Sequence, residues 1–273
     1  MVVPAHSTPQ GGRYSYSMTT HRSLLHLTGL LRDLWHAGGT GGLNWHAHAC
    51  YTRAQWQATV AQLETFLLQV IPKSNHLLLI GASAGWMMPP SWLQRFKQID
   101  AYDIDPLAAR LFDWRHGKTL RAQGVALRHH RQDALHTLGD VLQRHPHACV
   151  WFDNLLGQHR YRVRDEVQAE HDLATLKETL QGRHWGSVHD LYSGPTQDMQ
   201  WISRIASLTR AGVDNSHIDS QHTQTLLREV GARDVWVDHL TAQVFPQGCA
   251  TTLIPWAFKN QYCHWLQAGW VSA

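Results

Sequence analysis

Short apolar runs alternate with helical patterns along the chain from residue 76 onward. The apolar runs predict strands at residues 76–80, 99–103, 125–129, 148–153 and 186–191. Between them, apolar residues recur at helical spacing near residues 91–97, 106–116, 134–144 and 164–180. Because strands that alternate with helices form βαβ units, this pattern predicts a parallel sheet covered by helices.

The segment before the first strand has a helical pattern of its own. Thr52 and Gln55 form a predicted capping box, and apolar residues then recur every three or four positions until Pro72, which predicts an amphipathic helix. A shorter helix is expected at residues 24–35. We therefore expect residues 1–72 to form an N-terminal arm or helical cap, and residues 73–273 to form the main domain.

The alternation breaks after the fifth predicted strand. Residues 193–217 carry an extra helical stretch at 199–208, so this segment is interpreted as an insertion. A helix at residues 221–230 precedes strands at 234–240 and 251–258, and their connection is short enough for an antiparallel hairpin. The predicted fold is an α/β three-layer sandwich with a mostly parallel seven-stranded sheet that ends in an antiparallel hairpin.

Small residues follow the first strand directly, as Gly-Ala-Ser-Ala-Gly at residues 81–85. Such a turn lets the backbone approach a ligand closely. Asp103 ends the second strand 22 residues after Gly81, near the position from which an acid reaches a bound ribose. Asp133 follows the third strand and Asp153 ends the fourth. Because parallel strands end at the same edge of a sheet, these residues predict a ligand site there.

The order of these motifs resembles the class I S-adenosylmethionine-dependent methyltransferase family, which has a Rossmann-like fold. The likeness covers roughly residues 76–258 and consists of LLLIGASAG, YDIDP, RQDAL, WFDN and the final helix with its hairpin. It implies that the cofactor is S-adenosyl-L-methionine. The cofactor contacts that it implies are Gly81, Ala82, Ser83 and Gly85 on the methionine side, Asp103 at the ribose, Ile104 on the adenine, Asp133 and Ala134 at the adenine edge, and Asp153.

Methyl transfer needs the acceptor aligned with the methyl group and, where necessary, a base to remove a proton. The resemblance implies that Asp153 and Asn154 face the sulfonium and the acceptor. His189, near the end of the fifth strand, is a candidate base, although a histidine that is simply hydrogen-bonded within the sheet would explain it as well. We expect a small-molecule or peptide acceptor, recognised by the N-terminal arm and the insertion.

Three other functions stay open at this point. The glycine-rich turn also fits a G-x-S-x-G nucleophile elbow, in which Ser83 would attack an ester with Asp190 and His239 as nominal partners. The stretch GASAGWMMPP is loosely similar to nicotianamine synthases, which use the same cofactor for aminoalkyl transfer. The third alternative is a protein that binds the cofactor without turning it over.

Composition and charge limit the classes of partner and the cellular location that we expect for the protein. The 24 Lys plus Arg residues nearly balance 21 Asp plus Glu and are scattered, so no basic patch indicates nucleic-acid binding. The run Asp153-Asn154-Leu155-Leu156 also lacks the Pro-Pro and aromatic residue typical of enzymes that methylate amino groups of nucleic acids. No apolar stretch fits a signal peptide or a membrane span, and the four cysteines form no CxxC pair. These features favour a soluble cytoplasmic protein with no membrane partner, and they leave its oligomeric state open.

His46, His48 and Cys50 occupy alternate positions, and their side chains are ligands that zinc or iron accepts. No further ligand can be named from the sequence. We therefore assign no metal and interpret residues 45–50 as a loop that helps to close the pocket, with metal binding left as the alternative.

Overall fold

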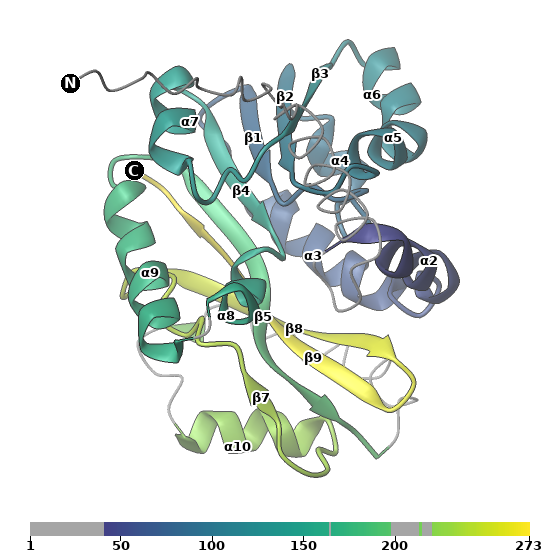
Figure 1. Cartoon of the computed structure of the whole chain (residues 1–273), viewed down its shortest axis with the longest axis vertical. Helices are drawn as coiled ribbons and strands as arrows, with labels where there is room; N and C mark the ends of the chain where they lie inside the picture. The colour runs from purple at the N-terminus through teal and green to yellow at the C-terminus, as the bar shows by residue number, and fades with distance from the viewer. Residues whose placement is uncertain (1–40, 164, 198–212, 215–219) are drawn as a thin grey trace, which may run out of the picture.

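The computed structural model describes residues 41–163, 165–197, 213–214 and 220–273. A single mixed sheet runs through the described residues, with the strand order β3-β2-β1-β4-β5-β9-β8-β6 (Figure 1). Its strands are β1 His76–Ile80, β2 Gln98–Asp103, β3 Ala126–Arg131, β4 Cys149–Asp153, β5 Trp185–Pro195, β6 Val213–Asp214, β7 Val237–Asp238, β8 Ala250–Lys259 and β9 Tyr262–Val271. Strands β1 to β5 are parallel, whereas β9 pairs antiparallel with both β5 and β8.

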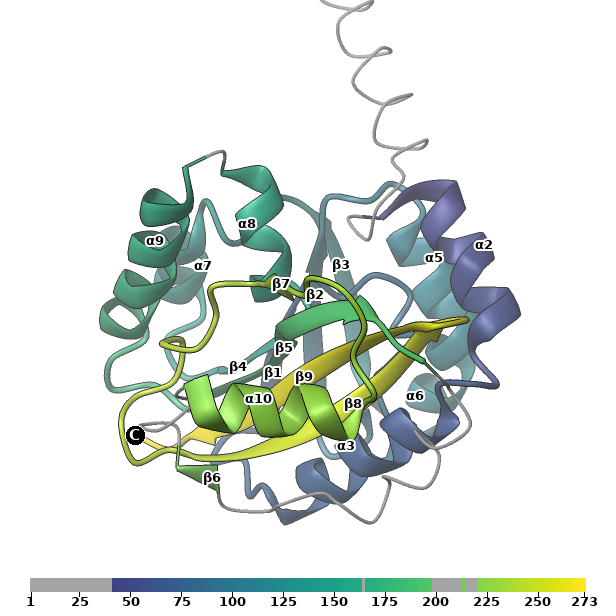
Figure 2. The same ribbon diagram turned by 90° about the horizontal axis from the view of Figure 1, so that it is seen from below.

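Helices cover both faces of this sheet (Figure 2). Those on one face are α2 Gly42–Thr52, α3 Gln57–Gln69, α4 Pro90–Leu93, α5 Ala108–Phe112, the π-helix η1 Asp113–Gly117 and α6 Lys118–Ala122. Those on the other are α7 Leu138–Arg144, the 3-10 helix η2 Leu156–Gln158, α8 His159–Arg162 and α9 Glu166–Thr179. Helix α10, Ser220–Glu229, packs near β8 and β9. The predicted three-layer α/β sandwich is confirmed, but the sheet has nine strands among the described residues where seven were expected.

Strand β1 shows why the parallel strands read as continuous apolar runs. Leu77 and Leu79 belong to the core on the α2–α6 face, whereas Leu78 and Ile80 belong to the core on the α7–α9 face. Side chains alternate between the two faces of a strand, and here both faces are covered. Every residue of β1 after the first is therefore buried.

A closing hairpin is present, but one of the two strands predicted to form it was wrong. The hairpin consists of β8 and β9, with Lys259 paired to Tyr262, and not of residues 234–240 and 251–258. Asp234 and Leu240 have φ values of 58° and 60°, which interrupt extended backbone. Within residues 234–240 only β7 is a strand, and it pairs with β5.

The predicted capping box was also wrong. Thr52 is the last residue of α2, and its Oγ1 donates a hydrogen bond to the carbonyl oxygen of His48, 2.8 Å away, within its own helix. Helix α3 begins at Gln57 without a side-chain cap. It packs on the sheet, where Thr59 Oγ1 donates to the Pro255 carbonyl oxygen at 2.9 Å.

Two other expectations fall outside the described residues, namely the helices at 24–35 and at 199–208. Among the residues that the structure does describe, no helix combines the length and apolar character needed to cross a bilayer.

Candidate functional site

A pocket opens at the carboxyl edge of the sheet, above β1 and β4. Chain order reverses between these two strands, and ligands of open α/β sheets bind at such switch points. The space within the pocket and its open mouth is about 840 Å³. Its lining residues are Gly41, Trp45, Ile80, Gly81, Ser83, Trp86, Met87, Tyr102, Asp103, Ile104, Gln132, Asp133, Ala134, Asp153, Asn154, Leu155, Gln158, Arg162 and Trp256.

The turn after β1 brings main chain against the pocket. Gly81 has a φ of 76°, and a Cβ there would lie 2.9 Å from the Leu155 Cβ, so only glycine fits. Ser83 also has positive φ, 44°. Its backbone N–H donates to Asp103 Oδ2 at 2.7 Å, and its Oγ accepts a hydrogen bond from Trp45 Nε1 at 3.0 Å. Ser83 is thus held between the Asp103 carboxylate and the Trp45 side chain.

Asp103 is held rigidly at the end of β2. Its Oδ1 accepts the backbone N–H of Asp105 at 2.8 Å, in addition to the bond from Ser83. Burial raises the pKa of Asp103 to about 6 against the effect of these two hydrogen bonds. The carboxylate is therefore mostly ionised at neutral pH and keeps lone pairs for a ligand.

Asp153 is the most perturbed group in the pocket. Burial, reinforced by the negative charge of Asp103, raises its pKa to about 8. Its Oδ1 is buried and has no hydrogen-bond partner among the described residues. A buried oxygen without a partner is costly, so this atom suits a ligand that supplies positive charge or a donor.

Asn154 follows Asp153 with a φ of 50°. Its Oδ1 accepts the backbone N–H of Asp190 at 3.2 Å, which joins the end of β4 to β5. The pocket also contains Asp133, whose carboxylate accepts a hydrogen bond from Arg162. Burial would raise the pKa of Asp133, but the hydrogen bond and charge of Arg162 outweigh it and hold the pKa below its usual value.

Ala82, Gly85 and His189 do not line the pocket. Gly85 has a φ of 61° and packs against His116, whose Nε2 lies 3.0 Å from the Gly85 carbonyl oxygen. His189 is fully buried in the sheet, with Ser187 Oγ 2.9 Å from its Nδ1 and Gln267 Oε1 3.3 Å from its Nε2. Burial lowers the pKa of His189 to about 4. The structure thus matches the interpretation of His189 as a hydrogen-bonded histidine of the sheet, outside the pocket lining.

The aromatic wall of the pocket was only partly visible in the sequence, and Trp256 was missed. Trp45, Trp86 and Trp256 line it from segments far apart in the chain, and Trp45 stacks on Phe258 with ring centroids 6.2 Å apart. No spacing rule joins such positions. The one local signal was the segment at residues 45–50, which forms part of helix α2 and not a loop.

That helix also separates the three possible metal ligands. His46 Nδ1 accepts a hydrogen bond from Trp86 Nε1 at 3.0 Å, so its Nε2 carries the proton and donates to Asp105 Oδ2 at 2.8 Å. His48 Nε2 lies 3.1 Å from the Phe258 carbonyl oxygen, and Cys50 is exposed. Residues two apart on a helix point in different directions, and these three side chains do not form one metal site.

The nominal partners of a Ser83 nucleophile are engaged elsewhere. Asp190 is buried, accepting from His264 Nδ1 at 2.8 Å through Oδ1 and from Gln158 Nε2 at 2.9 Å through Oδ2. His239 Nε2 lies 2.9 Å from Ser193 Oγ. The structure therefore assembles no Ser83–His239–Asp190 triad.

Comparison with known proteins returned no matching family model and no matching curated protein. Solved structures with a similar arrangement were found. The chain is similar to magnesium protoporphyrin IX methyltransferase from Synechocystis PCC 6803, solved with bound SAH, at 16% identity over 93% of this chain and 99% of that one, with a TM-score of 0.40. It is also similar to a putative O-methyltransferase from Nostoc punctiforme PCC 73102 at 13% identity, over 93% of this chain and 70% of that one, with a TM-score of 0.41.

A third similar structure is the N-methyltransferase NodS from Bradyrhizobium japonicum WM9 in complex with S-adenosyl-L-homocysteine. The identity is 12%, the match covers 89% of this chain and 96% of that one, and the TM-score is 0.37. Overall likeness is low in all three cases, and the function proposed below depends on the pocket.

Proposed function

We propose that the pocket binds S-adenosyl-L-methionine and that the protein transfers its methyl group to a small-molecule or peptide acceptor. The observation that carries this proposal is Asp153, a buried carboxyl group whose Oδ1 has no hydrogen-bond partner among the described residues and whose charge is coupled to that of the half-buried Asp103. Two acids so close together in one pocket favour a ligand with positive charge. S-adenosyl-L-methionine is such a ligand, since it carries a sulfonium and an amino group.

The residues at the pocket fit the parts of this cofactor. The turn at residues 81–85 would face the methionine portion, with Gly81 and Ser83 closest to it. Asp103 would accept hydrogen bonds from the ribose hydroxyls. Ile104 and Ala134 offer apolar surface for the adenine ring, while Asp133, already paired with Arg162, would border its edge.

When bound, the cofactor supplies a methyl group on a cationic sulfur. The protein would align the acceptor, exclude water and, where the nucleophilic atom of the acceptor is protonated, accept that proton. Asn154 and Asp153 would face the acceptor. Neither His189 nor His264 lines the pocket, and His264 is a second candidate base. Its Nδ1 is held by Asp190, and its Nε2 is buried without a partner among the described residues.

The Asp190–His264 pair lies directly behind two pocket-lining residues. Gln158 contacts Asp190, and the rings of Trp256 and His264 have centroids 5.0 Å apart. An acceptor seated against Gln158 and Trp256 would therefore be near this pair. The pair orients the imidazole through one nitrogen and leaves the other with a lone pair, as a general base requires.

Calorimetry with S-adenosyl-L-methionine and S-adenosyl-L-homocysteine tests the proposal. We expect binding of at least one of them at micromolar affinity, which corresponds to about −8 kcal/mol. If neither ligand binds, the proposed function is wrong. Once an acceptor is found, the by-product separates the reactions, because methyl transfer releases S-adenosylhomocysteine and aminoalkyl transfer releases methylthioadenosine.

The variant Ser83→Ala distinguishes the proposed methyltransferase function from the alternative hydrolase function. The cofactor contacts expected of Ser83 involve its backbone, so the variant should retain cofactor binding within about threefold. A fluorophosphonate probe should label neither protein. Labelling of the parent chain that disappears in the variant would favour the hydrolase.

A further inference from the structure

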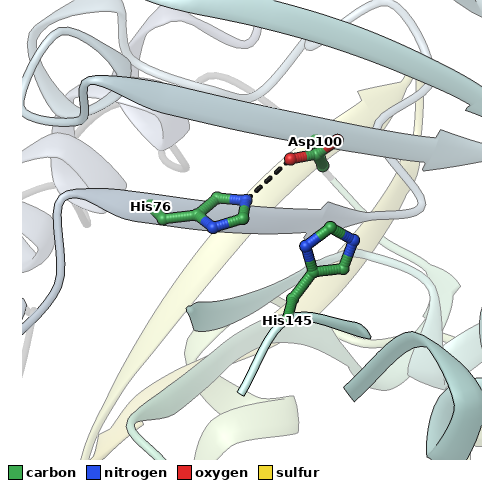
Figure 3. Close-up of side chains that lie close together, drawn as sticks. All are labelled: His76, Asp100 and His145. Atoms are coloured by element: carbon green, nitrogen blue, oxygen red, sulfur yellow. Dashed lines mark hydrogen bonds and ion pairs between the residues drawn. The ribbon is translucent and has the colours of Figure 1, made fainter. Parts of the chain in front are cut away.

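Two histidines and an aspartate, which are side chains that can bind a metal ion, lie together near the amino ends of the parallel strands, away from the pocket. His76 is the first residue of β1, Asp100 lies in β2, and His145 follows α7 just before β4 (Figure 3). His76 begins the strand that Ile80 ends beside the pocket. Four residues of strand span roughly 13 Å, so the two sites are separate.

The fold brings these three side chains together on one face of the sheet. His76 pairs in register with Gln98, so His76 and Asp100 project to the same face, on which α7 also packs. His76 Nε2 lies 2.7 Å from Asp100 Oδ2, and the rings of His76 and His145 have centroids 5.1 Å apart at 88°. One potential ligand atom from each residue lies within 4.8 Å of the other two.

These features match the requirements of a zinc ion. Zinc takes imidazole and carboxylate ligands at about 2.0–2.2 Å in tetrahedral geometry, which separates neighbouring ligand atoms by roughly 3.3 Å. Small side-chain rotations suffice to reach this spacing. We propose that His76, Asp100 and His145 bind Zn²⁺, with water completing the coordination.

Surrounding residues already hold the ligands in place. Asp100 Oδ1 accepts a hydrogen bond from His130 Nε2 at 2.7 Å, and Tyr102 Oη lies 3.2 Å from His145 Nε2. Outer contacts of this kind orient metal ligands. The Asp100 side chain is only 1% exposed, whereas that of His76 is 20% exposed, so the cluster has a buried base and an open side for an ion to enter.

The other group of this composition is less suited to a metal. Asp190, His239 and His264 are all buried. His239 has both ring nitrogens within 2.9 Å of a partner, at Ser193 Oγ and at the Gly157 carbonyl oxygen. Both oxygens of Asp190 are also engaged. A metal there would have to break these bonds inside a fully buried cluster. At the proposed site a metal would replace the hydrogen bonds of Asp100 Oδ2 with His76 and Gln98, but that cluster is open on the side of His76.

Titration calorimetry of the full chain with ZnCl2, after treatment with EDTA and desalting, tests the proposal. We expect a site of micromolar or tighter affinity that His145→Gln or His76→Gln weakens at least tenfold. His145→Gln leaves the contacts of Asp100 intact, and His147→Gln is the matched control, since His147 is exposed two residues away. The control should bind zinc as the parent does.

Zinc should also raise the Tm of the parent and of His147→Gln but not of His145→Gln, whereas Mg²⁺, which prefers oxygen ligands, should leave all three unchanged. Equal zinc affinity in all the proteins would overturn the proposal, as would no zinc binding by the parent. Metal-free circular dichroism establishes that each variant is folded, and the His76 variant replaces the His145 variant if the latter is not. Cofactor binding is measured separately, so failure of one proposal leaves the other standing.

Discussion

The pKa of Asp153 predicts that the affinity for the proposed cofactor depends on pH. Its value of about 8 means that roughly a tenth of the protein has an ionised Asp153 at pH 7 and roughly nine tenths at pH 9. A cationic ligand favours the ionised form. Its affinity should therefore rise about tenfold from pH 7 to pH 9, or about 1.4 kcal/mol, and level off above the pKa.

The ligand contributes a titration of its own, because α-amino groups have pKa values near 8. Asp153→Asn corrects for this, since the amide has the shape of the protonated acid and carries no charge at any pH. We expect the ratio of the variant's Kd to the parent's Kd for S-adenosyl-L-methionine to rise about tenfold between pH 7 and pH 9.

Calorimetry at half-unit steps from pH 6.5 to 9, in buffers of matched ionic strength, measures this ratio. Thermal melts at each pH verify that both proteins are folded. A ratio that stays constant across the range would refute the reasoning, because it would mean that Asp153 does not sense the charge of the ligand.

Three more predictions concern the cofactor and the fold. Asp103→Ala should weaken S-adenosyl-L-methionine binding tenfold or more by calorimetry, about 1.4 kcal/mol, while the variant still shows a cooperative melt. Gly85→Ala should lower the free energy of unfolding by about 2 kcal/mol or more in denaturant titrations, since φ is 61° and a Cβ would lie 2.7 Å from His116 Nε2. Gly139→Ala, whose Cβ would meet nothing within 4 Å, should change it by no more than about 1 kcal/mol. Burial lowers the pKa of His116 to about 4, so the unfolded chain takes up the proton first as pH falls below 6.5. The parent should lose about 1.5 kcal/mol more than His116→Asn between pH 6.5 and 5 in the same titrations.

Each of these has a clear contrary outcome. Unchanged affinity in Asp103→Ala would remove that carboxylate from the site. Equal stability of the two alanine variants would mean that the turn at Gly85 tolerates a side chain. Parallel pH profiles would mean that His116 is not a neutral buried group in the folded protein.

The sequence predicted correctly those features that depend on the position of a residue within a single strand or turn. The strand at residues 76–80 was predicted with the bounds of β1, because burial on both faces makes the whole run apolar. Glycine in the turn and acids at strand ends were visible for similar reasons, and Gly81, Asp103 and Asp153 do line one pocket. The alternation of strands and helices predicted that β1 to β5 are parallel, but it does not determine their order.

Features that depend on distant pairing were not visible. Strand β9 was missed, because its neighbours β5 and β8 bury it and its residues show no clear alternation. His189 was a candidate base because of its place near the strand end, but its environment depends on Gln267, 78 residues away. Trp256 reaches the pocket from β8. No local pattern reports such contacts.

The position of β9 also bears on how the chain folds as it leaves the ribosome. Strand β5 gains β4 as a neighbour early, but its other edge pairs with β9, which ends 76 residues after Pro195. At about 5–20 residues per second, synthesis of that interval takes roughly 4–15 s. Throughout this time an eleven-residue strand has one open edge, which is a template for pairing with other chains. To avoid aggregation through this edge, the nascent protein should therefore depend on a chaperone or on a low rate of expression. Stalling of translation before β9 is synthesised should cause more aggregation than stalling after it.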